Sequence, residues 1–125
     1  MKKKIVAGIC STFLMMGCSQ DSGTYRKITP EEAKALMEQD EVTIVDVRTS
    51  EEFAQGYIEG ALLLPDNEIV TKAEELLPHK DAVILLYCRS GRRSELAARA
   101  LMELGYTQVL DFGGILDWPY ETVKP

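Results

Sequence analysis

Apolar and polar positions along the chain form blocks that predict strands alternating with helices. Apolar runs rich in β-branched residues predict strands at 42–47, 61–64, 82–87 and 107–110. Between these runs, helical spacing of apolar residues predicts helices that begin near residues 30 and 50 and others that cover 69–77 and 94–104. This order implies an α/β fold: a three-layer sandwich in which a mostly parallel sheet of about five strands is covered by helices.

Two of the predicted helices share the same start signal. Thr29 and Thr49 each stand three positions before a glutamate, Glu32 and Glu52, which is the pattern of a capping box. At the other end of the longest helix, Gly105 is placed to stop it, because glycine adopts the left-handed conformation that ends helices. The boundaries of these helices are therefore predicted as well as their existence.

The composition fits one globular domain of an acidic protein. The chain has 125 residues, with 14 basic and 20 acidic side chains and a formal net charge of -6. Such a charge disfavours nucleic acid as a partner, since affinity there depends on neutralising phosphates. Three arginines nevertheless fall within residues 89–93. This local positive charge indicates a small anionic substrate, and the alternative is a solvated helix start.

The first residues have the pattern of an export signal. Met1–Lys4 carries positive charge, and Ile5–Met16 is apolar. As a helix, the apolar stretch spans only about 18 Å, well short of the hydrocarbon core of a bilayer. We therefore expect residues 1–17 to be a secretory signal peptide rather than a membrane span.

The residues after this stretch, Gly17-Cys18, resemble the processing site of bacterial lipoproteins. The resemblance implies cleavage before Cys18, lipid on its sulfur, and anchoring of the protein at a membrane of the bacterial cell envelope. Met15 stands where that pattern prefers leucine, and an ordinary signal peptide or an uncleaved anchor are the alternatives. Residues 18–27 are then the lipidated N-terminus and a polar tether, and 28–125 form the domain.

Cysteine use points to one reactive sulfur. If Cys10 leaves with the leader and Cys18 carries lipid, Cys88 is the only free thiol, and no disulfide can form within one chain. A sulfur atom carried on Cys88 must then pass to an external acceptor. The single histidine, His79, and one free cysteine are too few for a zinc site, so we expect no metal and no cofactor.

Cys88 follows a buried strand and precedes a helix, within the sequence Cys-Arg-Ser-Gly-Arg-Arg-Ser. The strand carries the sulfur to the edge of the sheet, and Gly91 allows the chain to curl. The helix N-terminus and the nearby arginines favour a thiolate, so we expect an exposed and ionised sulfur. The alternative is an inert thiol, because free cysteines are commonly buried. Asp46 and Arg48 follow another strand, at the edge where parallel sheets bind ligands.

Taken together, these motifs resemble the single-domain rhodaneses, a family of sulfurtransferases. The resemblance covers residues 25–123. Its motifs are Asp46-Val47-Arg48, residues 51–61, the loop 88–94, and Gly113-Gly114 followed by Trp118. One departure is Tyr57, which stands where many relatives have histidine.

The resemblance implies a reaction in which Cys88 is the catalytic nucleophile. It takes a sulfane sulfur from a small anionic donor such as thiosulfate, and its persulfide passes the sulfur to cyanide or to a thiol, including a protein thiol. A monomer is expected. The residues implied in substrate binding are those of the loop, Arg89, Ser90, Gly91, Arg92, Arg93 and Ser94.

Roles within this loop follow from the same resemblance. Backbone N–H groups of residues 89–94 are expected to surround the sulfur. Arg89 is expected to meet the donor's sulfonate, and Ser94 to bond within the loop. Two supporting ion pairs are expected, Arg93 with Asp46 and Arg48 with Glu52.

Two other functions are alternatives to sulfur transfer. Phosphatases and arsenate reductases of a related fold need an arginine six positions after the cysteine, and residue 94 is a serine. A non-catalytic binding module at the membrane surface is the other alternative, although such modules usually lack the nucleophile that Cys88 supplies.

Overall fold

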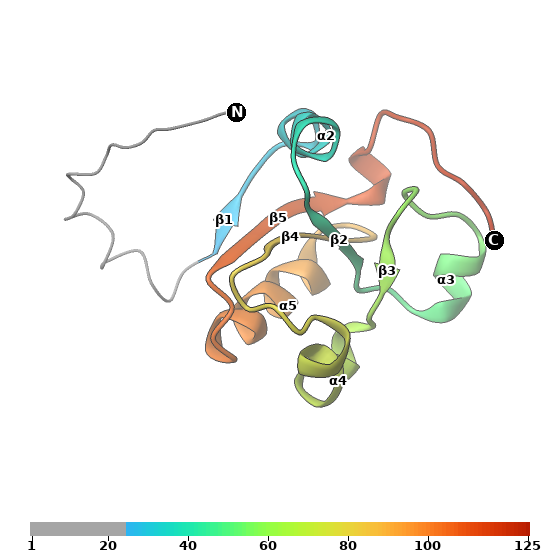
Figure 1. Ribbon diagram of the computed structural model, residues 1–125. Coiled ribbons are helices and arrows are strands. Elements are labelled where there is room, and N and C mark those ends of the chain that lie inside the picture. The colour runs from blue at the N-terminus through green and yellow to red at the C-terminus, as the bar shows by residue number, and fades with distance from the viewer. Residues whose placement is uncertain (1–24) are drawn as a thin grey trace, which may run out of the picture.

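The computed structural model describes residues 25–125, which form an α/β fold around one five-stranded sheet (Figure 1). The strand order is β1-β5-β4-β2-β3, and neighbouring strands run parallel. The prediction of a mostly parallel sheet is thus confirmed. The predictions for residues 1–17 and for Cys18 lie outside the described residues. The strands are β1 (Arg26–Lys27), β2 (Thr43–Asp46), β3 (Leu62–Leu63), β4 (Val83–Cys88) and β5 (Gln108–Gly114).

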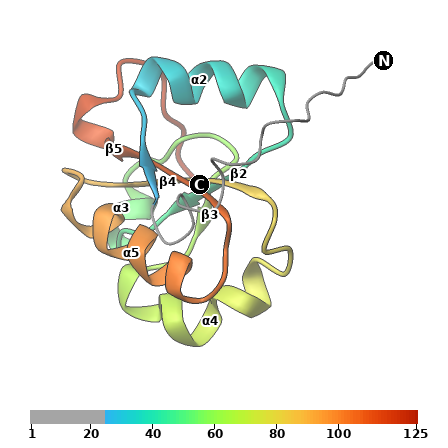
Figure 2. The same ribbon diagram turned by 90° about the vertical axis from the view of Figure 1, so that its left-hand side faces the viewer.

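Helices cover both faces of the sheet. α2 lies on one face, and α4 and α5 lie on the other (Figures 1 and 2). Within residues 25–125, no helix has the length and apolar character needed to cross a membrane. The helices are α2 (Pro30–Gln39), α3 (Ser50–Ala54), α4 (Ile69–Leu76) and α5 (Arg92–Glu103), with short 3-10 turns η3 (Asp66–Glu68) and η4 (Ile115–Asp117).

Both predicted capping boxes are present. Thr29 Oγ1 accepts the N–H of Glu32 at 3.0 Å, and the Glu32 carboxylate accepts the N–H of Thr29 at 2.9 Å. In the same way, Thr49 Oγ1 accepts the N–H of Glu52 at 3.2 Å, and the Glu52 carboxylate accepts the N–H of Thr49 at 3.0 Å. These bonds satisfy N–H groups that have no partner within the helix, so α2 and α3 begin where the sequence predicts.

β4 lies at the centre of the sheet and contributes to both apolar cores. Because successive side chains of a strand point to opposite faces, Leu86 and Cys88 belong to the core beneath α4 and α5. Leu85 and Tyr87 belong to the core beneath α2. All four side chains are fully buried. This alternation decides the direction in which the Cys88 sulfur points.

The sheet extends further than the sequence analysis predicts. Arg26 and Lys27, which we expected in the polar tether, pair with β5, so the prediction was wrong for these two residues. Short polar strands have no apolar pattern by which to find them. β5 continues to Gly114, four residues beyond the predicted end, because Gly114 still pairs with Cys88.

Candidate active site

Cys88 is the last residue of β4, and α5 begins at Arg92, two residues earlier than predicted. The turn between them ends at Gly91, whose φ of 107° is a conformation that favours glycine. The N–H of Gly91 donates to the Cys88 sulfur at 2.9 Å. The expectation that loop amides point at the sulfur is thus confirmed for Gly91.

The sulfur is not exposed, contrary to the expectation from the sequence. Cys88 is 0% exposed and belongs to the apolar core that contains Val47, Leu64 and Ala97. The alternation of β4 points the side chain into the core beneath α5, and the Gly91 N–H contacts the sulfur from the loop. Nearby arginines do not imply exposure, because arginine side chains can extend away from the loop that carries them.

A buried hydroxyl and a buried carboxyl lie next to the sulfur. Ser94 Oγ is 3.7 Å from Cys88 Sγ and donates to Asp111 Oδ1 at 2.7 Å. Asp111 also accepts the N–H of Gly113 at 2.9 Å, and its burial raises the pKa of the carboxyl. Ser94 contacts the loop as expected, with its Oγ 3.1 Å from the Gly91 carbonyl oxygen. Sequence reasoning missed Asp111, although an acid within an apolar strand is a visible signal.

The segment that contains Gly113 and Gly114 packs closely against the cysteine loop. A Cβ at Gly114 would overlap the carbonyl oxygen of Arg89, so only glycine lets the two backbone segments approach this closely. The Leu116 N–H then donates to the same carbonyl at 3.2 Å. The loop around Cys88 is therefore fixed to the segment that follows β5.

The loop residues border two cavities. One, of about 390 Å³, is lined by Arg89 together with Arg48 and Glu52. The other, of about 340 Å³, is lined by Ser90, Gly91, Arg92 and Asp111, among others. Cys88 lines neither cavity. The residues predicted to bind one substrate are thus divided between two faces of the loop.

The two predicted ion pairs were wrong, because the partners are exchanged. Arg48 binds both oxygens of Asp46, with its Nη2 2.6 Å from Oδ2, and it also donates to the Gly56 carbonyl at 2.7 Å. Arg93 instead binds both oxygens of Glu52, at 2.8 and 3.0 Å. Asp46 and Arg48 leave the same strand end two residues apart, which favours the local pair. Arg93 projects from the first turn of α5 toward α3.

Hydrogen bonding and burial shift the pKa values of the groups in these pairs. The hydrogen bonds from Arg93 lower the pKa of Glu52 to about 2. Burial, and then the hydrogen bond to Asp46, raise the pKa of Tyr87. The Tyr87 hydroxyl donates to Asp46 at 2.6 Å and accepts the Ile58 N–H at 3.1 Å. The Glu52–Arg93 pair is therefore charged at neutral pH.

Arg89 and Arg92 remain available for an anion. Both side chains are exposed, and neither makes an ion pair with any residue among 25–125. Of the two, only Arg89 lines the cavity that Arg48 also lines. Arg89 therefore places a guanidinium without an ion-pair partner among residues 25–125 on this cavity.

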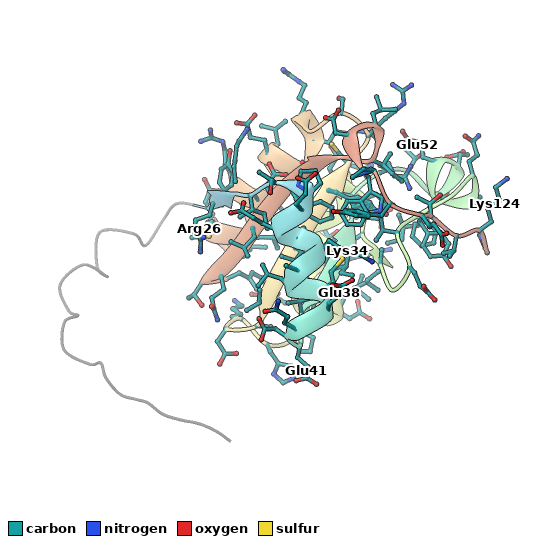
Figure 3. The ribbon with its side chains drawn as sticks, turned by 90° about the horizontal axis from the view of Figure 1, so that it is seen from above. Arg26, Lys34, Glu38, Glu41, Glu52 and Lys124 are labelled. Carbon is teal, nitrogen blue, oxygen red and sulfur yellow. The ribbon has the colours of Figure 1, made fainter. Side chains whose placement is uncertain are left out.

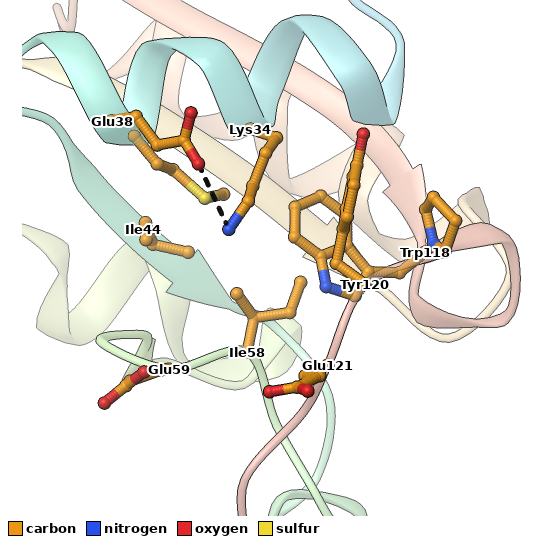
Figure 4. Close-up of a pocket in the computed structure, with 10 residues that line it drawn as sticks. Lys34, Glu38, Ile44, Ile58, Glu59, Trp118, Tyr120 and Glu121 are labelled. Atoms are coloured by element: carbon orange, nitrogen blue, oxygen red, sulfur yellow. Dashed lines mark ion pairs between the residues drawn. The ribbon is translucent and has the colours of Figure 1, made fainter.

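A larger cavity, of about 740 Å³, lies between α2 and the C-terminal segment (Figure 4). Its wall includes the Lys34–Glu38 ion pair, at 3.5 Å, and the Trp118 and Tyr120 rings. No cysteine, serine or threonine lines this cavity, so it holds no thiol or aliphatic hydroxyl nucleophile.

The remaining residues singled out from the sequence lie away from the sulfur. Tyr57 stacks on Phe53 with ring centroids 4.0 Å apart, and His79 is exposed. Across residues 25–125, no group of three or more His, Cys, Asp or Glu side chains is arranged to hold a metal ion.

Known proteins are similar to this chain in sequence and fold. The rhodanese-like domain family matches residues 29–120. A sulfurtransferase from Allochromatium vinosum is 44% identical over 87 residues, which are 69% of this chain and 79% of that protein. Thiosulfate sulfurtransferase PspE from Escherichia coli is 35% identical over 80 residues, 64% of this chain and 77% of that protein.

Among solved structures, a rhodanese with anions from E. coli superposes with a TM-score of 0.64 at 33% identity. It covers 68% of this chain and 100% of that chain. The family match includes the cysteine loop, the strand that carries it and the double glycine that supports it. On this evidence the chain belongs to the family of rhodanese-like domains, which includes sulfurtransferases.

Proposed function

We propose that the protein is a sulfurtransferase that carries a sulfane sulfur on Cys88. The observation that supports this most directly is the Gly91 N–H aimed at the Cys88 sulfur from the start of α5. A backbone donor and a helix N-terminus stabilise negative charge on the sulfur in both its thiolate and persulfide forms. Sulfurtransferase relatives at 44% and 35% identity support the same activity.

The proposed reaction has two displacements. In the first, the Cys88 thiolate attacks the outer sulfur of a thiosulfate-like donor, the bond between the two donor sulfurs breaks, and sulfite leaves with the electron pair. In the second, cyanide or a thiolate attacks the outer sulfur of the Cys88 persulfide. The bond to Cys88 breaks, and Cys88 leaves as a thiolate. Splitting the transfer through a covalent intermediate is the usual advantage of such a nucleophile.

Arg89 is proposed to bind the donor. It is exposed, unpaired among residues 25–125, and borders the cavity beside the loop. Arg48 lines the same cavity, but Asp46 neutralises its charge. The donor's sulfonate thus meets one free guanidinium rather than a strongly positive pocket.

Because Cys88 is fully buried, the loading step requires residues 89–91 to move. The loop is held by the Leu116 N–H, which donates to the Arg89 carbonyl, and by the Gly91 N–H, which donates to the sulfur. Breaking these two bonds is a local event of the kind that loops at functional sites undergo. A non-catalytic module, the alternative function, needs no such opening.

We further propose that the protein acts at the bacterial cell envelope, anchored through lipid on Cys18. The lipoprotein-like sequence Gly17-Cys18 supports this location. Cys18→Ala then abolishes retention in the membrane fraction of cells that express the full chain. Unchanged fractionation contradicts lipid anchoring and favours an uncleaved leader.

The activity is tested with thiosulfate and cyanide. Thiocyanate should form with the native protein and not with Cys88→Ser, and mass spectrometry should show one added sulfur atom on Cys88 after thiosulfate treatment. Circular dichroism and the unfolding midpoint of Cys88→Ser provide the control for folding. A folded native protein that gains no sulfur from thiosulfate and forms no thiocyanate contradicts the proposal and favours the binding module.

A further inference from the structure

Behind the loop, three buried groups form a continuous line of hydrogen bonds. The Cys88 thiol is placed to donate to Ser94 Oγ at 3.7 Å, and the Ser94 hydroxyl donates to Asp111 Oδ1 at 2.7 Å. Cys88 and Ser94 are 0% exposed, and Asp111 is 2% exposed. The proposed nucleophile is therefore linked by hydrogen bonds to two other buried polar groups.

Asp111 differs from the other buried carboxylate of the domain in lacking a cation. Asp46 is bound by Arg48, whereas no lysine or arginine among residues 25–125 forms an ion pair with Asp111. A buried carboxylate without a counter-charge favours its protonated form, because burial penalises the charge. Its neighbour Cys88 must also become negative during sulfur transfer, and two adjacent buried negative charges are costly.

We propose that Asp111 and Cys88 share one proton through Ser94, so that Asp111 takes the thiol proton when Cys88 is loaded and returns it when the sulfur leaves. The proposal rests on the proposed sulfur transfer and adds a positioning residue to it. Asp111 acts on the sulfur only through Ser94.

The transfer balances without any other reactant. The S–H bond of Cys88 breaks as its proton moves to Ser94 Oγ, and the Ser94 O–H bond breaks as that proton moves to Asp111 Oδ1. The thiol and carboxylate become a thiolate and a carboxylic acid, and the serine is unchanged. The site carries one negative charge before and after, so the thiolate forms without adding charge to the core.

The direction of the Ser94 hydroxyl changes with this transfer. While Asp111 is ionised, it takes the single Ser94 hydrogen at 2.7 Å. Once Asp111 holds the proton, its O–H donates to Ser94, and the Ser94 hydrogen turns to the sulfur. The thiolate or persulfide anion then has a second donor besides the Gly91 N–H.

Asp111 also has a route to solvent that avoids the donor. It lines the cavity of about 340 Å³, whereas Arg89 and Arg48 line the other one. The charged groups that face Asp111 there are Lys27 from β1 and Glu95 and Arg92 from α5. Lys27 is 3.6 Å from Glu95, and its charge lowers the pKa of Asp111 by less than burial raises it. Protons can therefore leave on one side of the loop while substrate binds on the other.

Carbon-13 NMR of the Asp111 carboxyl tests the proposal without any turnover. The resonance, assigned through Asp111→Asn, is titrated in the native protein and in Cys88→Ser, whose serine does not ionise. If the proton is shared, the native titration has two steps. In Cys88→Ser the upper step disappears. The single remaining step has its midpoint at least about one pH unit below the upper native step. Superimposable titrations in the two proteins overturn the proposal.

The pH profile of Cys88 alkylation by iodoacetamide gives a second measurement. We expect two steps in the native protein, one step in Asp111→Asn, and the native shape in Glu95→Gln, which removes a carboxylate from the same cavity. The native two-step shape in Asp111→Asn overturns the proposal. If Asp111→Asn does not fold, the titration of Cys88→Ser decides. Coupled titrations in a protein that transfers no sulfur would contradict the proposed function alone.

Discussion

Arg89 and Arg92 are alike in chemistry and three positions apart, but they face different cavities. The side chain on the cavity with Arg48 can meet a donor, and the other lies beside Asp111. Position relative to the loop, rather than charge, therefore separates their roles. Both are exposed and lack an ion pair within residues 25–125, so substitution of either one breaks no salt bridge there.

We expect Arg89→Ala to raise the KM for thiosulfate about tenfold or more while lowering kcat less, because its contact is present in the bound ground state as well. A charge-assisted hydrogen bond of about 1.5–3 kcal/mol is consistent with this change. Arg92→Ala is the matched comparison and should raise KM much less. Steady-state kinetics over a range of thiosulfate concentrations decides; equal KM values for the two variants would show that their positions do not matter.

Substitutions at the adjacent glycines, Gly113 and Gly114, distinguish the effect of steric overlap from that of backbone strain. Gly114→Ala forces a Cβ onto the Arg89 carbonyl, although its φ of -120° suits any residue. Gly113→Ala meets open space but must adopt a φ of 93°. We expect each to lower the free energy of unfolding by about 1–3 kcal/mol, for these different reasons.

Sulfur loading should distinguish the two variants. Gly114→Ala displaces the loop over Cys88 and should abolish persulfide formation, whereas Gly113→Ala should retain it. Mass spectrometry after thiosulfate treatment measures the persulfide. Full loading of a folded Gly114→Ala would mean that the close approach of the two backbones is not needed for chemistry.

The sequence located the cysteine loop correctly, but the expected partners of the two supporting ion pairs were exchanged. Both arginines and both acids have the right chemistry, and only the direction of each side chain decides between Arg48 with Asp46 and Arg93 with Glu52. The burial of Cys88 depends in the same way on the alternation of β4. Residue type predicts which chemistry is present, whereas three-dimensional placement decides which groups meet.

Among the elements, the short helix α3 depends on a single side chain, Glu52, for two different contacts. Glu52 completes the capping box with Thr49, and its carboxylate also binds Arg93 of α5. The Glu52 side chain therefore caps the start of α3 and also joins α3 to α5, the helix that follows the cysteine loop. The Glu32 carboxylate of α2 has the capping role alone.

This difference permits a matched comparison. Glutamine preserves a capping box, so Glu52→Gln removes mainly the ion pair with Arg93, and Glu32→Gln removes no ion pair. We expect Glu52→Gln to lower the free energy of unfolding by about 1–2 kcal/mol at pH 7, allowing for partial exposure of the pair. Glu32→Gln should change it by less than about 0.5 kcal/mol. Urea denaturation measures both.

The pH dependence of this loss has a defined sign. The folded-state pKa of Glu52 is lowered from 4.5 to about 2, so the pair stabilises the fold fully above pH 4.5. The stabilisation is lost as the pH falls from 4.5 toward 2. The stability difference between the native protein and Glu52→Gln should therefore shrink over this range. A constant difference from pH 7 to pH 2 would contradict the assignment to the ion pair.

Elements with a strong local signal were predicted, and those defined only by pairing were not. Thr29 and Thr49 begin α2 and α3 as the capping boxes indicate. β1 has no apolar residue, and the last residues of β5 are strand only because β4 lies beside them. Pairing between distant segments leaves no trace in a local pattern.

For the whole molecule, β1 decides where the folded unit begins. Arg26 and Lys27 pair with β5, the Ile28 N–H donates to the Asp111 carbonyl at 3.0 Å, and Tyr25 donates to Glu95 at 3.0 Å. These contacts cover the edge of β5 and one end of α5. The folded unit therefore includes residues 25–27 as well as the residues from 28 onward.

A truncation series checks this boundary. A chain that starts at Tyr25 should keep the urea unfolding midpoint of the longer protein, because every described contact remains. A chain that starts at Thr29 loses β1 and should be less stable by about 1–3 kcal/mol, since buried hydrogen bonds at the edge of β5 lose their partners. Equal midpoints for the two chains would mean that β1 adds nothing to the folded unit.

The position of β1 also bears on how the domain is held. Lys27 of β1 lines the cavity of about 340 Å³ together with Ser90 and Arg92 of the cysteine loop, and Arg26 and Glu52 lie on opposite sides of the domain (Figure 3). A lipid on Cys18 would therefore hold the domain through the strand that borders the Arg92 side of the loop. A bulky acceptor protein would then have its open approach on the Arg89 side, which borders the other cavity.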